Sequence, residues 1–170
     1  MGSEEMEFTA PWGTMLKVMS TLTTVLLLGV FGGMAISGRA SSPLEILLYL
    51  LIPLLILAGG LLFVVRGYRL TCEGLSVRRL LWDTRVGLGV VRRVEHDPKA
   101  MTGAIRTWGN GGLFSFSGRF RSGKLGSFRA WVNDNGNCVI IETLSGTLVV
   151  SPGDPERFAK EVRNRFWSGS

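Results

Sequence analysis

Two apolar runs, Met15–Ile36 (MLKVMSTLTTVLLLGVFGGMAI) and Leu44–Val65 (LEILLYLLIPLLILAGGLLFVV), stand almost back to back in this chain. Each has 22 residues. At about 1.5 Å rise per residue, each gives a helix of roughly 33 Å, which is enough to cross a hydrocarbon core of about 30 Å. The single charge in each run, Lys17 or Glu45, lies near its start, where a long side chain can reach the headgroups. The sequence therefore predicts a transmembrane helical hairpin over residues 13–65.

The orientation of this hairpin follows from the Lys and Arg residues near its ends. The linker Ser37–Pro43 is short and contains one cation, Arg39. The cations on the other side are Lys17, Arg66, Arg69, Arg78 and Arg79. The positive-inside rule then places both termini in the cytoplasm. We do not expect the first run to be a cleaved signal peptide, because an acidic segment precedes it and a second span follows.

The charge of the chain is unevenly divided. Residues 66–170 carry 17 Lys and Arg against 9 Asp and Glu, a net charge of +8, and residues 1–65 carry a net charge of −2, which together give +6. A basic domain tethered to a membrane is attracted to anionic lipid by about 1 kcal/mol for each cation near the surface. The alternative is a basic surface that is only solvated. Nucleic acid, the other usual partner of such charge, is not expected here.

Two small features of the hairpin bear on contacts. Gly29 and Gly33 form a Gly-x-x-x-Gly motif, which lets two helices approach closely, either within the hairpin or between two copies of the chain. Trp12 and Tyr68 flank the two spans, where aromatic residues of the membrane interface are common.

Cys72 and Cys138 lie in apolar runs and are predicted to be buried free thiols.

The chain after Val65 changes from helical to strand periodicity. Residues 66–167 contain about seven short runs of alternating apolar and polar residues separated by turn residues, among them Asn133–Gly136, which is predicted as a hairpin turn. Asp154 and Pro155 then favour a helix start, and Phe158 and Val162 repeat at helical spacing. We predict antiparallel strands capped by one C-terminal helix, preceded by a mobile acidic lead over residues 1–12.

Several segments of this part resemble the bacterial pleckstrin-homology (PH)-like domains. The segments are Tyr68–Arg78, Gly109–Gly112, Gly118–Phe120, Leu125–Phe128, Trp131 and Val149–Phe158. The resemblance implies a PH-like fold, often placed after one or two spans, and a binding or scaffolding role at a bacterial inner membrane. It implies no catalytic residues. Phosphoinositide-binding members of the superfamily use a long basic loop between the first two strands. Here that loop is only Glu73-Gly74, so specific phosphoinositide binding is not expected.

The sequence offers little for catalysis. His96 is the only histidine, expected in a solvent-facing loop, so neither a paired-histidine metal site nor a Ser-His-Asp triad is indicated. We predict a protein that is not an enzyme and that needs no cofactor. The candidate contact for anionic lipid or a partner is the basic segment with Arg119, Arg121 and Lys124, joined by Arg78 and Arg92.

These features favour a membrane-anchored interaction module that binds a protein partner, its own copies or anionic lipid. The alternative is an accessory subunit of a membrane enzyme or transporter, acting through the hairpin.

The predicted topology is open to a direct test. Cysteines introduced at Ser42 and at Ser168 should be labelled by an impermeant reagent from opposite faces of the membrane. Labelling of both from the periplasmic side would contradict the hairpin or its orientation.

Overall fold

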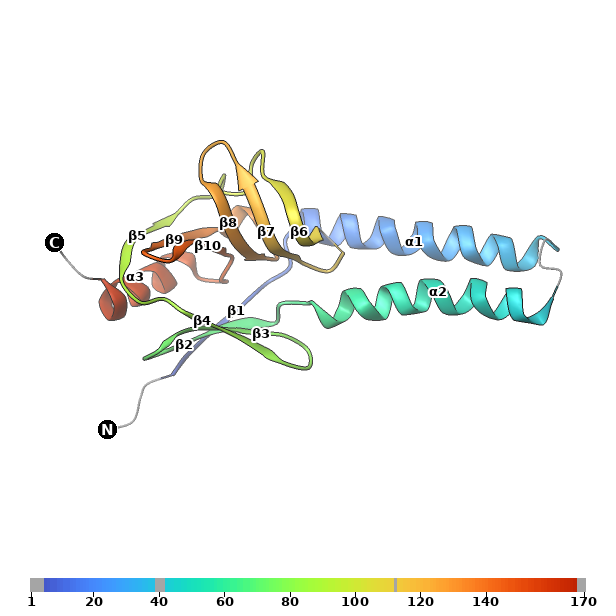
Figure 1. Ribbon diagram of the computed structural model, residues 1–170, viewed down its shortest axis with the longest axis horizontal. Helices are drawn as coiled ribbons and strands as arrows, with labels where there is room; N and C mark the ends of the chain where they lie inside the picture. Colours follow the sequence, from blue (N-terminus) through green and yellow to red (C-terminus); the bar gives the residue numbers. More distant parts are fainter. Residues whose placement is uncertain (1–4, 39–41, 112, 168–170) are drawn as a thin grey trace.

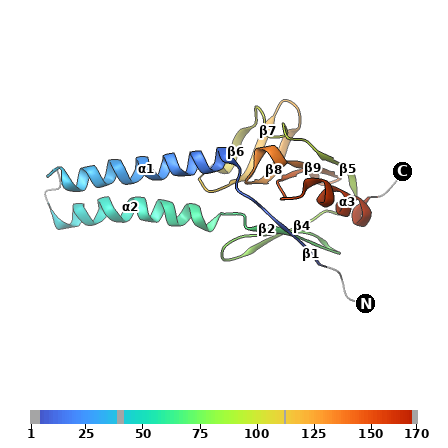
Figure 2. The same ribbon diagram turned by 180° about the vertical axis from the view of Figure 1, so that it is seen from behind.

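The computed structural model in Figure 1 describes residues 5–38, 42–111 and 113–167. Two long helices extend side by side from one end of a domain built of strands, and a short helix lies at the opposite end of that domain (Figures 1 and 2). Arg39 of the linker, Gly112 and Ser168 lie outside the described residues.

The long helices are α1 (Thr14–Ile36) and α2 (Pro43–Leu62). The Ser42 hydroxyl caps α2 by accepting a hydrogen bond from the Glu45 amide at 3.3 Å. Both helices are long and apolar enough to cross a membrane, and only 6% and 11% of their most apolar stretches is buried within the protein. Almost all of this apolar surface therefore lacks protein cover, which is unfavourable in water.

The second helix is shorter than the apolar run that predicts it. It ends at Leu62, and Val65 is fully buried in the core of the strand domain. The last residues of the run therefore belong to the domain rather than to the helix.

In the part of the chain that the structure describes, ten strands form two sheets. The first sheet has the order β1 (Met6–Thr9), β2 (Gly67–Thr71), β3 (Gly74–Arg78), β4 (Asp83–Gly87). The second has the order β5 (Val91–His96), β9 (Val139–Thr143), β10 (Gly146–Val150), β8 (Gly126–Val132), β7 (Phe116–Ser122), β6 (Ile105–Gly111). Neighbouring strands are antiparallel except β8 and β10, which are parallel. The helix α3 (Pro155–Phe166) follows β10, so the predicted architecture of strands with a C-terminal helix is confirmed.

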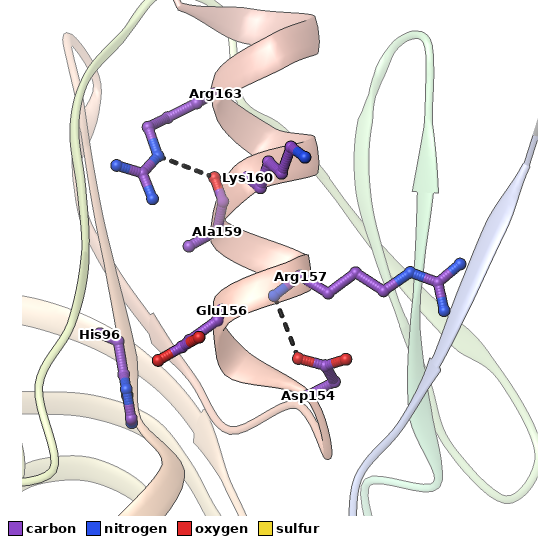
Figure 3. A pocket seen from close by; sticks show the side chains of 7 residues that line it. All are labelled: His96, Asp154, Glu156, Arg157, Ala159, Lys160 and Arg163. Carbon is purple, nitrogen blue, oxygen red and sulfur yellow. Dashed lines mark hydrogen bonds between the residues drawn. The ribbon is translucent and has the colours of Figure 1, made fainter.

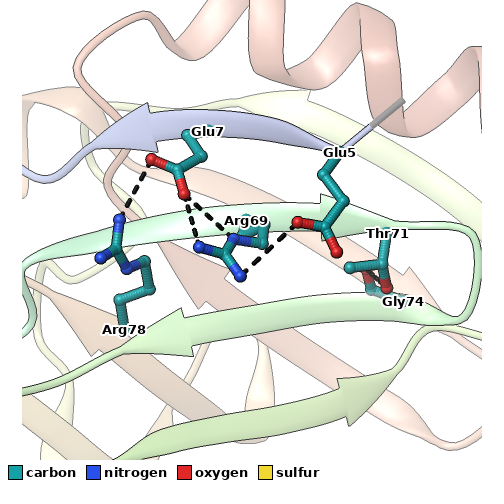
Figure 4. A network of polar contacts seen from close by, with 6 residues as sticks. All are labelled: Glu5, Glu7, Arg69, Thr71, Gly74 and Arg78. Atoms are coloured by element: carbon teal, nitrogen blue, oxygen red, sulfur yellow. Dashed lines mark hydrogen bonds and ion pairs between the residues drawn. The ribbon is translucent and has the colours of Figure 1, made fainter. Parts of the chain in front are cut away.

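The expectation of a mobile lead is wrong for residues 6–9, which form β1 and pair with β2. The side chains of Met6 and Phe8 pack into the core. Glu7 points outward and accepts hydrogen bonds from Arg69 and Arg78, while Glu5 forms a second ion pair with Arg69 (Figure 4). The alternation of apolar and acidic residues in this segment is that of an edge strand with one buried face.

The predicted hairpin turn at Asn133–Gly136 is also wrong. The strands on either side of it, β8 and β9, are not neighbours, because β10 lies between them. The connection contains a short 3-10 turn (η1, Asn135–Asn137), capped by the Asp134 carboxylate, which accepts a hydrogen bond from the Gly136 amide at 2.9 Å. The local turn chemistry was visible in the sequence, but the crossing to a more distant strand was not.

The main core lies where α3 packs against the sheets. Phe158 is fully buried, and its ring meets that of Phe8 edge-on, with 5.0 Å between centroids. Tyr68, predicted to lie at the membrane interface, is instead fully buried in the same cluster. Its hydroxyl donates to the Trp131 carbonyl at 2.6 Å and accepts from the Ser151 amide at 3.1 Å. The phenol hydroxyl thus has both a hydrogen-bond acceptor and a donor inside the protein, so Tyr68 can be buried without contact with water or the membrane interface.

The two cysteines differ. Cys138 is buried as predicted, and burial raises the pKa of its thiol to about 12. Cys72 lies in the turn between β2 and β3 and is exposed, so its predicted burial is wrong. The turn follows the last buried residue of β2, and turns are normally at the surface.

A single amide joins the domain to both chain segments that lead to the helices. Asn133 is 1% exposed, and its side-chain nitrogen donates to the carbonyl of Ala10 before α1 (3.1 Å) and to the carbonyl of Val65 after α2 (2.6 Å). Its backbone carbonyl accepts from the Gly13 amide at 3.0 Å. Asn133 therefore holds the beginning of α1 and the end of α2 at one point of the second sheet.

A loop of the second sheet adds two further contacts with the helices. The Phe114 amide donates to the Ser20 hydroxyl of α1 at 3.0 Å, and the Ser115 hydroxyl donates to the Phe63 carbonyl after α2 at 2.9 Å. Phe114 has a φ of 62°, which is uncommon for a bulky residue. The loop thus adopts an unfavourable backbone conformation where it contacts α1, and the tertiary contacts must stabilise it.

Phe158→Ala should destabilise the protein by about 3–5 kcal/mol, because it leaves a cavity where α3 packs on the sheets. This is a large share of the roughly 5–15 kcal/mol that holds an ordinary domain. The measurement is thermal unfolding of the detergent-solubilised full chain. Trp167→Ala, at an exposed position at the end of the same helix, is the control. Equal melting temperatures for the two variants would show that α3 is peripheral.

Asn133→Ala should also destabilise the full chain, because the carbonyls of Ala10 and Val65 lose their donor, and each buried polar group left unpaired costs about 1–3 kcal/mol. Asn164→Ala, at an exposed position of α3, should have almost no effect in the same unfolding measurement. If both variants melt together with the wild type, the amide does not hold the helices to the domain.

Candidate functional site

The basic segment predicted as a contact surface does not form one patch. Arg119 and Arg121 are two positions apart on β7, so their exposed side chains share a face of the sheet. Lys124 follows in the turn between β7 and β8 and pairs with Asp97. The Lys124 ammonium holds the pKa of that carboxyl below its usual range. Part of the predicted charge is therefore neutralised within the domain.

The other two candidates lie elsewhere. Arg78 takes part in the network around Glu7, at 3.1 Å (Figure 4). Arg92 is exposed on β5, which lies at the opposite edge of the second sheet from β6. The five basic residues chosen from the sequence are thus distributed over several surfaces, and only Arg119 lines the cleft described below.

The glycine motif of α1, Gly29 and Gly33, is not covered by neighbouring side chains. A Cβ atom added at Gly29 or Gly33 would meet no atom within 4 Å, so these glycines are not where α1 packs on α2 in this structure. Contact with a second copy stays a prediction.

A hollow beside α3 contains the single histidine. Its walls include His96, Asp154, Glu156 and Lys160 (Figure 3). His96 ends strand β5 and is half-buried, which corrects its predicted place in a solvent-facing loop. The Asp154 carboxylate accepts a hydrogen bond from the Arg157 amide at 3.0 Å and so serves as the cap of α3. Within the described residues no group of three His, Cys, Asp or Glu side chains is arranged to hold a metal ion.

An open cleft of about 1360 Å³ lies between the two sheets, next to the end of α2. One wall is the last turn of α2 with Gly59, Gly60 and Phe63. The facing walls come from the end of β3 and from β6, β7 and β8. The cleft therefore has the end of an apolar helix on one side and strands of the domain on the other.

Four arginines line this cleft: Arg79, Arg106, Arg119 and Arg129. None of the described residues that line it is acidic. Across β7 and β8, Arg119 lies directly opposite Arg129. Like charges at opposed positions of a sheet destabilise it, so the fold concentrates positive charge here at a cost.

Aromatic rings or carbonyls contact three of the four guanidinium groups, those of Arg79, Arg106 and Arg129. Arg79 lies over the rings of Phe63 and Trp82, at 5.4 and 5.8 Å from their centroids, and donates to the Thr84 hydroxyl at 3.2 Å. Arg129 lies over the Trp131 ring at 5.4 Å. Such contacts orient a guanidinium without neutralising its charge. Burial lowers the pKa of Arg79, because its side chain is partly removed from water.

Two facing glycines bring β6 close to β7 at the cleft. Gly109 and Gly118 pair across the strands, with φ values of 107° and 146°. A Cβ at Gly118 would lie 2.1 Å from the Trp108 carbonyl oxygen, and one at Gly109 would lie 2.4 Å from the Ser117 carbonyl oxygen. Only glycine fits at both positions, so this pair fixes where Arg106 and Trp108 stand on the neighbouring strand.

The turn between β3 and β4 is apolar and lies beside the end of α2. Leu80, Leu81 and Trp82 are 48%, 72% and 40% exposed, and the Trp82 ring contacts that of Phe63 at 5.7 Å. Trp108 on β6 is 78% exposed. Trp12, the other aromatic residue predicted at the interface, packs near Phe114 with 6.0 Å between centroids. Three large apolar residues in a row, Leu80, Leu81 and Trp82, are a signal for this surface that is present in the sequence.

Comparison with known proteins adds a family to this geometry. The family model described as Bacterial PH domain matches residues 66–166. Neither the comparison with curated proteins nor that with solved structures gave a match. The matched region begins at the first residue after the apolar hairpin and ends at the last residue of α3, so it covers most of the chain and nearly all of the strand domain. The chain therefore belongs to the bacterial PH domain family.

Proposed function

We propose that this protein is a non-enzymatic interaction module that a transmembrane hairpin holds against the cytoplasmic face of the bacterial inner membrane. The observation that supports this most is the lack of protein cover on the two apolar helices, whose most apolar stretches are only 6% and 11% buried. The membership of a family whose domains are generally not catalysts supports the non-enzymatic part.

The edge of the domain beside the helices has the composition of a membrane boundary. The apolar turn Leu80–Trp82 projects beside the end of α2, and exposed Trp108 lies on β6, which also borders the cleft at α2. Tryptophan prefers the headgroup level of a bilayer, and exposed leucines at this level gain by entering the acyl boundary. In this arrangement the turn dips into the membrane surface next to the hairpin.

The joint at Asn133 supports a fixed position of the domain. A flexible tether would leave the domain free to rotate, whereas here both ends of the hairpin are bonded to one buried side chain. A module held in one orientation presents the same face to the lipid and the same face to the cytoplasm. We therefore expect its interactions to be directional.

This placement predicts that residue 81 contacts lipid. In the variant Leu81→Cys with Cys72→Ser, an environment-sensitive fluorophore on residue 81 should shift its emission to shorter wavelength in liposomes and be quenched by spin-labelled lipid. The same fluorophore on the native Cys72 is the matched control, because the β2–β3 turn lies at the other end of β3 from the β3–β4 turn. Buried Cys138 should not be labelled in either protein.

Equal quenching of the two probes would show that the apolar turn is not at the membrane. A second outcome would separate insertion of the hairpin from docking of the domain. The fluorophore on residue 81 would show no shift in emission, although the liposomes retain the protein after alkaline extraction. In that case the hairpin would be an anchor and the domain would not lie on the membrane surface.

A further inference from the structure

Two sets of cations in the domain differ in their surroundings. In the first, carboxylates neutralise them: Arg69 and Arg78 pair with Glu7, Arg93 pairs with Glu95, and Lys124 pairs with Asp97. In the second are the four arginines of the cleft, none of which forms an ion pair with a described carboxylate. Exposed cations outside both sets, such as Arg92 and Arg121, lie away from the cleft, so the four arginines are distinguished by lining one cleft in which none of the described lining residues is acidic.

The four guanidinium groups are partly used and partly available. Arg106 donates one N–H to the Gly109 carbonyl at 3.1 Å, and Arg79 donates to Thr84 and, at 3.5 Å, to the Phe63 carbonyl. Each guanidinium has five N–H donors. The remaining donors of these side chains can bind the oxygens of one anion, and the planar fork of arginine suits a phosphate.

The position of the cleft distinguishes a lipid from a soluble anion. Gly59 and Gly60 line it, and both lie in the last turns of the apolar helix α2. A Cβ at Gly60 would lie 2.7 Å from the Leu113 side chain, so this glycine lets the domain close against the helix. A ligand bound to the arginines can thus place apolar chains along α2, which a free phosphate ester does not have.

We propose that the cleft between the sheets is a site for the phosphate of an anionic phospholipid from the adjoining leaflet, with the acyl chains lying along α2. This rests on the proposed function, since it requires α2 to stand in the bilayer. Arg106, Arg119 and Arg129 contact the phosphate from the second sheet, and Arg79 contacts it from the first. The site is separate from the short β2–β3 turn, which lies at the other end of β3 from Arg79.

The experiment uses the full chain in nanodiscs of phosphatidylcholine with a minor share of phosphatidylglycerol. The association of spin-labelled phosphatidylglycerol is compared with that of spin-labelled phosphatidylcholine. The test variant is Arg106→Gln with Arg119→Gln, and the control is Arg92→Gln with Arg121→Gln. Both variants remove two exposed cations, but those of the control lie outside the cleft.

A cation near anionic lipid contributes about fivefold in affinity, so we expect the affinity of the test variant for phosphatidylglycerol to fall about 30-fold. The control should retain its preference.

Three results would overturn the proposal. One is a wild-type protein with no preference for phosphatidylglycerol. Another is a control variant that loses as much as the test variant, since the attraction would then be that of any basic surface. The third is displacement of the lipid by millimolar inorganic phosphate or glycerol phosphate, since the ligand would then be a soluble anion.

Two further measurements keep these results unambiguous. The melting temperature and the probe on residue 81 should be unchanged in the test variant, which separates loss of the site from loss of the fold or of the membrane placement. A photoreactive residue at position 108, activated in native membranes, should cross-link to lipid. A discrete adduct with another protein at that position would assign the cleft to a protein partner instead.

Discussion

The arrangement of this protein depends on one buried amide. Asn133 donates to a carbonyl on each side of the helical hairpin, before α1 and after α2. In sheet terms, β1 and β2 are paired neighbours, and the two helices replace the turn that would otherwise join them. Hydrogen bonds to buried carbonyls are strongly directional, and leaving them unmade is costly. The amide therefore fixes the position of the two apolar helices, which lie between β1 and β2 in the sequence, relative to the strand domain.

The charge distribution of the domain has a comparable logic. The net positive charge of the sequence suggests a broadly attractive surface, but ion pairs within the domain neutralise several of the cations. Four of the remaining arginines line the cleft next to the end of α2, where aromatic rings contact two of them. Burial lowers the pKa of Arg79, whose guanidinium lies over the rings of Phe63 and Trp82. A site that keeps cations unpaired in a partly buried place gains most when an anion arrives.

The sequence was sufficient for the features that depend on local periodicity. The two apolar helices, the strand region and the helix begun by Asp154 and Pro155 are confirmed. It was not sufficient where distant segments decide the outcome. Tyr68 has the position of an interface residue along the chain, but Ser151 and the Trp131 carbonyl draw its hydroxyl into the core. The cleft was missed for the same reason: Arg79, Arg106 and Arg129 come from three separate strands or their ends, and only the topology brings them to Arg119.

The pairing of β1 with β2 has a consequence for the order of assembly. During synthesis β1 emerges first, but its partner emerges only after both helices. If the hairpin crosses the bilayer, the two strands meet on one side only when both crossings are complete. In a chain with a single crossing, Met6 and Phe8 would remain on the other side of the membrane from the domain. The core around Phe158 would then stay open. Correct insertion would thus be a precondition for a closed domain, and the first sheet would act as a check on membrane topology.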